Sequence, residues 1–147
     1  MRLLPRRSVL FIPCLALAAA TVFAQAPGVL GYWREPGGSV IRIIPCDQKV
    51  CVEIVGLPPG KHHVTDGRNP DPKLRSRLLC GLRIGEGFVE VDPQTARGGR
   101  LYDPRNGRTY SGQMTVEGVL LRLRGYVGLP MFGRTQTWTR ASRPPPC

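Results

Sequence analysis

The chain has 147 residues, with 21 lysines and arginines against 10 acidic residues, for a formal net charge of +11. Its basic residues are scattered and are not interleaved with aromatics, which argues against a nucleic-acid-binding surface. The charge indicates either a simple positively charged surface or attraction to anionic partners, such as envelope glycans or small acids.

The first residues have the three parts of a secretory signal. Three arginines within the first seven positions form a positive n-region, and an apolar run from about Ser8 to Ala20 follows. Val22-Phe23-Ala24 offers a signal-peptidase site before Gln25. The apolar run is too short to span a membrane. The sequence therefore predicts a cleaved signal peptide over residues 1–24 and a mature protein that is periplasmic or secreted.

The remainder is predicted to be a single domain, residues 25–147, ending in a proline-rich tail at 141–147. Taking 24 residues and their three arginines from 147 residues and +11 leaves 123 residues and a charge of +8. No other apolar stretch approaches the length of a membrane span, so we expect none in the mature chain.

Short runs of β-forming residues, separated by glycine and proline, follow one another along the mature chain. The predicted strands are Gly31–Glu35, Ser39–Pro45, Val50–Gly56, Leu78–Ile84, Phe88–Val91, Arg100–Asp103, Arg108–Val116, Val119–Tyr126 and Arg134–Arg140. The Asn-Gly in DPRNGR is a hairpin signal. An open sheet of eight or nine strands would expose long edges. We therefore predict an all-β fold, a small antiparallel up-and-down barrel with little helix.

Four cysteines remain in the mature chain, an even number that favours disulfides in an oxidising compartment. The motif CDQKVC places Cys46 and Cys51 across a hairpin, where Cα separations suit a disulfide. Cys80, in LLCGLRI, is either a buried free thiol or the partner of Cys147 in the RPPPC tail, and the spacing does not decide between them.

One long polar segment, Leu57 to Arg77, interrupts the series of short predicted strands. Loops of this length in compact domains are often lids or binding loops, and the alternative is a tolerated insertion. Its second half, NPDPKLRSR, predicts one helical turn capped by Asn69 or Asp71, with proline near its start.

The last strand, GRTQTWTR, raises the question of what lies inside the barrel. Strand alternation puts Arg134 and Gln136 on the face of Trp138, and the three threonines between them on the other. If Trp138 faces inward, both polar groups enter the barrel. They form either a self-satisfied network or a contact to an acidic head group from Arg134, with Trp33, Tyr110 and Trp138 as apolar walls.

No catalytic or metal-binding constellation is visible in the sequence. His62 and His63 point in opposite directions on an extended loop, and no cysteine or carboxylate pattern completes a metal site. No serine is tied to a histidine, and the carboxylates are dispersed. We expect no catalytic residues, no metal and no cofactor.

Several long motifs resemble one protein family. GYWREPGGSVIRI, NPDPKLRSRLLCGLRI, GGRLYDPRNGRTYSG and RGYVGLPMFGRTQTWTR together are similar to DUF2147, a group of small exported bacterial proteins of unknown function. The resemblance runs from Gly31 to Arg140. It implies a lipocalin-like barrel outside the cytoplasm and no established activity or cofactor. It also implies that Trp33, in a Gly-x-Trp opening, packs beneath an arginine of the last strand, Arg140 first and Arg134 second.

The sequence thus favours a periplasmic binding module for a small apolar or amphiphilic ligand, with an anionic head group as one form. The alternative is an envelope structural or interaction protein with a filled barrel and a basic exterior. A cavity of about 300 Å³ or more with apolar walls would favour the first, and a packed interior the second.

Overall fold

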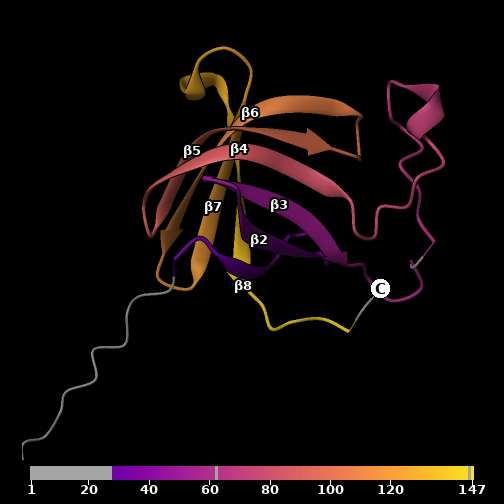
Figure 1. Cartoon of the computed structure of the whole chain (residues 1–147), viewed down its shortest axis with the longest axis horizontal. Coiled ribbons are helices and arrows are strands. Elements are labelled where there is room, and N and C mark those ends of the chain that lie inside the picture. The colour runs from indigo at the N-terminus through magenta and orange to yellow at the C-terminus, as the bar shows by residue number, and fades with distance from the viewer. Residues whose placement is uncertain (1–27, 62, 146) are drawn as a thin grey trace, which may run out of the picture.

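The computed structural model describes residues 28–61, 63–145 and 147, and these form a closed antiparallel barrel (Figure 1). Its strands are β1 (Gly31–Arg34), β2 (Val40–Cys46), β3 (Lys49–Gly56), β4 (Arg83–Asp92), β5 (Thr95–Asp103), β6 (Arg108–Glu117), β7 (Leu120–Tyr126) and β8 (Arg134–Arg140). Each strand pairs with the next, and β1 pairs with β8. The predicted up-and-down barrel is confirmed. The predicted signal peptide, residues 1–24, lies outside the described residues.

The helix in the described ranges is limited to two single turns, η1 (Pro72–Leu74) and η2 (Pro130–Phe132). Neither has the length or the apolar character that crossing a membrane requires. Asp71 caps η1, because its side chain accepts a hydrogen bond from the Lys73 amide at 2.9 Å. This confirms the predicted helical turn and one of its two predicted caps.

The prediction of a separate strand at Leu78–Ile84 was wrong. Leu78 forms an isolated β-bridge with Thr65, and a turn follows at residues 79–81. Strand β4 begins at Arg83 and continues to Asp92, taking in the predicted strand Phe88–Val91. Gly81 at φ +80° makes the turn, and its amide donates to the Ile54 carbonyl. Gly87, at φ +76°, lies within β4, so it bends a continuous strand instead of ending one.

The barrel interior is filled at one end by side chains from all eight strands. Alternation along β3 places Val50, Val52 and Ile54 in the core. Phe88 is fully buried, and β5 and β6 pass close to its ring. A Cβ on Gly99 would lie 2.2 Å from that ring, and one on Gly112 would lie 2.9 Å from it. These two glycines therefore make the space that Phe88 occupies.

The barrel closes where β1 meets β8. Trp33 pairs with Arg140 across the two strands, and the Arg140 guanidinium lies 3.7 Å from the centre of the Trp33 ring. The same guanidinium donates hydrogen bonds to the carbonyls of Gly28 and Leu30 at 2.6 and 2.8 Å. Trp33 is fully buried and donates from its indole nitrogen to the Val29 carbonyl at 2.8 Å. Arg140 thus ties the segment before β1 to the end of β8.

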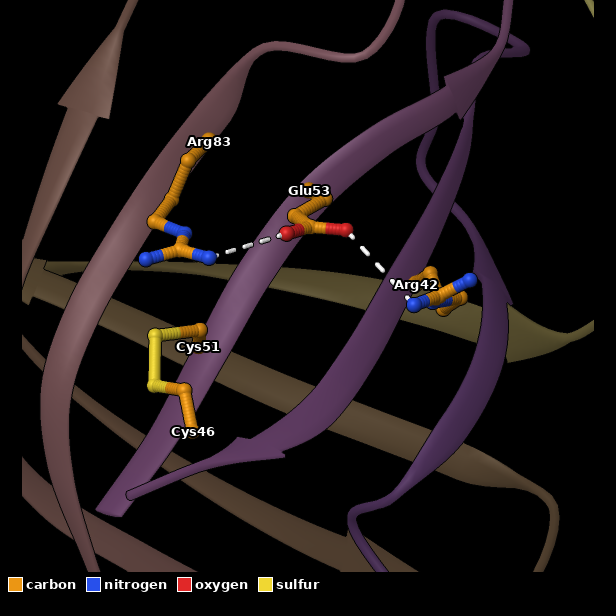
Figure 2. Close-up of a disulfide and its surroundings, with 5 residues drawn as sticks. All are labelled: Arg42, Cys46, Cys51, Glu53 and Arg83. Atoms are coloured by element: carbon orange, nitrogen blue, oxygen red, sulfur yellow. Dashed lines mark hydrogen bonds and ion pairs between the residues drawn. A yellow bond between two sulfur atoms is a disulfide. The ribbon is translucent and has the colours of Figure 1, made fainter.

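The predicted Cys46–Cys51 disulfide is confirmed, with a Cα–Cα distance of 5.8 Å (Figure 2). It lies on the outer face of the β2–β3 hairpin. On the same face Glu53 lies between Arg83 and Arg42, at 3.3 and 3.9 Å (Figure 2). Partly exposed ion pairs of this kind contribute little to stability. The disulfide closes a short loop and contributes about 2 kcal/mol in the chain-entropy model.

A second disulfide, Cys80–Cys147, resolves the alternatives that the sequence left open for these cysteines. The tail that follows β8 runs to the loop after β3 (Figure 1). On the way, Pro144 covers β3, since a Cβ on Gly56 would lie 3.0 Å from its side chain. The bridge joins positions 67 residues apart and fastens the tail beside Leu79. Two disulfides are consistent with a compartment outside the cytoplasm.

Candidate functional site

The other end of the barrel is hollow. A cavity of about 810 Å³ opens between the four connections β1–β2, β3–β4, β5–β6 and β7–β8. Its deeper wall is apolar and comes from inward positions of the strands. The side chains of that wall are Ile41, Ile54, Ile84, Leu101, Leu123 and Trp138. The volume lies within the range of pockets that hold small molecules.

The last strand presents to this cavity the face that the alternation of its sequence predicted. Arg134, Gln136 and Trp138 line the cavity, and the three threonines that alternate with them are exposed on the outside. Trp138 is 3% exposed, whereas Arg134 lies at the open end and is exposed to solvent. The face of β8 that lines the cavity therefore becomes more polar from Trp138, at the cavity floor, to Arg134, at the rim.

Gln136 has a partner within the same strand. The Trp138 indole nitrogen donates to Oε1 of Gln136 at 3.1 Å. Tyr110, on β6, lines the cavity, and its hydroxyl accepts a hydrogen bond from Nδ2 of Asn106 at 3.0 Å. Both side chains are thus held in fixed positions on the wall.

The carboxylates on the cavity lining are already engaged. Glu35 accepts hydrogen bonds from the amides of Gly37 and Ser39 at 2.7 and 2.9 Å. Asp103 forms two parallel hydrogen bonds with the Arg105 guanidinium, at 2.9 and 3.1 Å. Neither carboxylate bonds to the other two arginines of the lining.

Those two arginines, Arg108 and Arg134, are the free cations of the cavity rim. Among the described residues, neither has a salt-bridge partner, and neither guanidinium donates a hydrogen bond. Both side chains are exposed to solvent. An anionic group at the rim would find two guanidinium groups that no carboxylate of the lining already bonds.

The long loop of residues 57–77 is docked on the barrel by one buried carboxylate. Asp66 is 1% exposed and accepts from the Tyr102 hydroxyl at 2.6 Å, from Asn69 at 2.7 Å and from Arg77 at 2.8 and 3.0 Å. Burial and the hydrogen bond to Asp66 raise the pKa of the Tyr102 hydroxyl above its usual value. Tyr102 also lines the cavity, so this network fixes the loop beside the opening.

Two of the residues considered from sequence lie away from the cavity. Trp33, predicted to be an apolar wall, is buried at the closed end beneath Arg140 and does not contribute to the lining. His63 is exposed and does not line the cavity, and His62 lies outside the described residues. Over the described part of the chain, no three His, Cys, Asp or Glu side chains form a cluster that would hold a metal ion.

Sequence reasoning missed Arg108 as a cavity residue. Arg108 and Tyr110 are two positions apart on β6, and both line the cavity. Tyr110 was assigned to the inward face, so the same alternation was a signal for Arg108. Tyr102 was missed for a different reason, because its role depends on contacts with a loop distant in sequence.

Comparisons with known proteins agree with this fold. The family model described as "Uncharacterized protein conserved in bacteria (DUF2147)" matches residues 31–140. No curated protein matches the chain. Among solved structures, the chain is similar to protein HP1028 from the human pathogen Helicobacter pylori, described as belonging to the lipocalin family. The identity is 23% and the TM-score 0.73, over 79% of this chain and 84% of that one. At this identity the likeness shows the fold.

Proposed function

Because the chain belongs to the DUF2147 family of bacterial proteins and has a lipocalin-like barrel, we propose that it is an exported binding protein for a small amphiphilic ligand. The apolar tail of the ligand enters the barrel, and its anionic head group stays at the rim. The observation that carries this proposal is the open cavity of about 810 Å³, with apolar walls inside and free arginines outside.

The volume of the cavity supports a ligand-binding protein over a protein whose barrel is filled and that acts only through its outer surface. A packed interior would leave no room for a ligand, whereas this cavity exceeds the roughly 300 Å³ of small binding pockets. The second interpretation, an envelope structural protein, has no comparable observation in its favour.

The position of the charges supports an anionic head group. Arg134 follows Gln136 and Trp138 outward along β8, so a bound molecule would meet apolar atoms first and a guanidinium at the rim. A carboxylate or phosphate there would form charge-assisted hydrogen bonds. We propose binding without catalysis, since the described cavity lining includes neither histidine nor cysteine to serve as a base or nucleophile.

The site of action that we propose is the periplasm or the cell exterior. The signal-like sequence of residues 1–24 and the two disulfides support export. Peptide mapping of the protein from its own host would check the expected mature start at Gln25.

Substitution of Arg134 tests the head-group contact. We expect Arg134→Met to weaken binding of dodecanoate by about tenfold to 150-fold, the equivalent of the ~1.5–3 kcal/mol of a hydrogen bond to a charged group. Binding of dodecanol, which has the same tail and no charge, should change little. Isothermal titration calorimetry with both probes measures the two affinities.

Thr137→Val is the matched control for this substitution. Thr137 lies on the same strand as Arg134 but on its outer face, so its change should leave both affinities as they were. If Arg134→Met weakened the binding of dodecanoate and of dodecanol equally, the arginine would not distinguish a charged head group from an uncharged one. This result would contradict the proposed head-group contact.

A further inference from the structure

An exposed apolar loop stands beside the cavity opening. We call residues 127–133, between β7 and β8, the mouth loop; its sequence is VGLPMFG. Four of its side chains are exposed: Val127 by 74%, Leu129 by 59%, Met131 by 71% and Phe132 by 76%. Single exposed apolar residues are ordinary, but a contiguous group marks an interaction site.

The mouth loop holds these side chains outward in an ordered conformation. The Arg124 guanidinium donates to the carbonyls of Pro130 and Met131 at 2.7 and 3.1 Å, and to the Thr135 hydroxyl at 2.9 Å. The amide of Phe132 closes the η2 turn on the Leu129 carbonyl at 3.2 Å. The loop, the gold coil between β7 and β8, rises clear of β6 in Figure 1. Because the loop is already ordered, it would lose little conformational entropy on binding.

The charge around the mouth loop is positive. Arg124 lies beneath the loop, Arg134 follows it, and Arg108 lies on the same rim of the barrel. Arg124 uses its donors on uncharged oxygens, so its charge remains uncompensated. As described above, Arg108 and Arg134 also lack acidic partners among the described residues. Each arginine near an anionic lipid surface strengthens binding by about fivefold.

We propose that the mouth loop docks the barrel on an anionic lipid bilayer. The four apolar side chains enter the boundary between head groups and acyl chains, and the arginines meet the anionic head groups. Val127 and Phe132 also line the cavity, so docking would place the cavity opening at the lipid surface. Docking depends on the loop and its charges and does not require the proposed cavity ligand.

The size and shape of the surface favour a bilayer over a protein partner. A stable protein interface buries roughly 800 Å² on each partner, spread over twenty or more residues. The mouth loop offers four exposed apolar side chains within seven residues. A projecting apolar tip with basic surroundings fits the boundary of an anionic membrane.

Co-sedimentation with vesicles tests this proposal on the whole mature chain. We expect binding to vesicles of phosphatidylethanolamine with phosphatidylglycerol, weaker binding to phosphatidylcholine alone, and loss of binding as salt is raised. The double variant Leu129→Ser/Met131→Ser should weaken vesicle binding about tenfold or more, because two buried apolar side chains are lost. Neither residue lines the cavity, so the affinity of the double variant for dodecanoate should be unchanged.

Val119→Ser provides the matched control. Val119 is 67% exposed, a fraction similar to that of the loop residues, but it lies in the β6–β7 turn at the opposite end of the barrel. This variant should bind vesicles as the wild type does. The proposal is overturned if the wild type binds neither kind of vesicle or if the two variants bind equally. It is also overturned if sedimentation velocity shows a dimer that the double variant abolishes, since a second copy would then be the occupant.

Discussion

Replacing Trp33 by alanine is expected to lower the free energy of unfolding by about 3–5 kcal/mol, the range for large aromatic side chains removed from a core. Trp33 is fully buried where the barrel closes. Its loss would open a void and would also remove the aromatic face beneath Arg140, an interaction of roughly 0.5–2 kcal/mol. Among the described residues, the Arg140 guanidinium lies over no aromatic ring other than that of Trp33. Burial lowers the pKa of this guanidinium.

Trp33→Phe is the matched control for this prediction. It keeps an aromatic face for Arg140 and loses the 2.8 Å hydrogen bond to the Val29 carbonyl. We expect a smaller loss, about 1–2 kcal/mol, from one hydrogen bond and some volume. Guanidinium denaturation followed by far-ultraviolet circular dichroism measures both variants. If alanine cost no more than phenylalanine, closure of the barrel would not depend on this contact.

Removal of the Cys80–Cys147 bridge has the second large expected effect. A cross-link between positions 67 residues apart contributes about 4 kcal/mol in the chain-entropy model, because it restricts a long stretch of the unfolded chain. The Cys80→Ser/Cys147→Ser variant should therefore unfold at markedly lower denaturant concentration. The tail would no longer be fastened beside Leu79, at the edge of the cavity.

The second disulfide provides an internal comparison. Cys46→Ser/Cys51→Ser removes a bridge over five positions, for which the same model gives about 2 kcal/mol. Urea denaturation of both double variants should therefore rank the long bridge above the short one. The reverse order would mean that the packing around each bridge, and not the length of its loop, determines its contribution.

The sequence was most informative where alternation alone determines the structure. On β8, the buried Trp138 was enough to place Arg134 and Gln136 on the cavity side and the threonines outside. The hairpin of Cys46 and Cys51 was likewise readable, because the two cysteines are close in sequence and their strands are adjacent.

The main errors in the predicted strand boundaries occurred at glycines, because glycine is found both in turns and in irregular parts of strands. The predicted strands ended at Ile84 and resumed at Phe88, leaving out Gly85–Gly87, yet β4 continues through these residues. The predicted strand Arg100–Asp103 likewise left out Gly98 and Gly99. They lie instead within β5, where Gly98 has φ +73° and Gly99 makes room for Phe88. Only the position of the Phe88 ring explains Gly99, and that position is a tertiary fact.

The cavity itself could not be predicted from the sequence. Its volume depends on how side chains from eight strands fill the two ends of the barrel, which no local pattern records. The Cys80–Cys147 bridge depends in the same way on the path of the tail across β3. The sequence alone therefore left ligand binding as one of two interpretations.

Native mass spectrometry of the protein purified from its own host tests the central claim most directly, when compared with a variant whose cavity is blocked. Gly125 lines the cavity on β7, and a Cβ there would make only ordinary contacts with the Tyr110 side chain, at 3.6 and 3.9 Å. Gly125→Phe should therefore place an aromatic ring in the path of a ligand inside the cavity without disturbing the strand.

The wild type is expected to carry the added mass of one small molecule, released on denaturation as an anion, and Gly125→Phe is expected to carry none. The bare polypeptide mass for the wild type, or the same added mass on both proteins, would contradict the claim that the open end of the barrel is a ligand site.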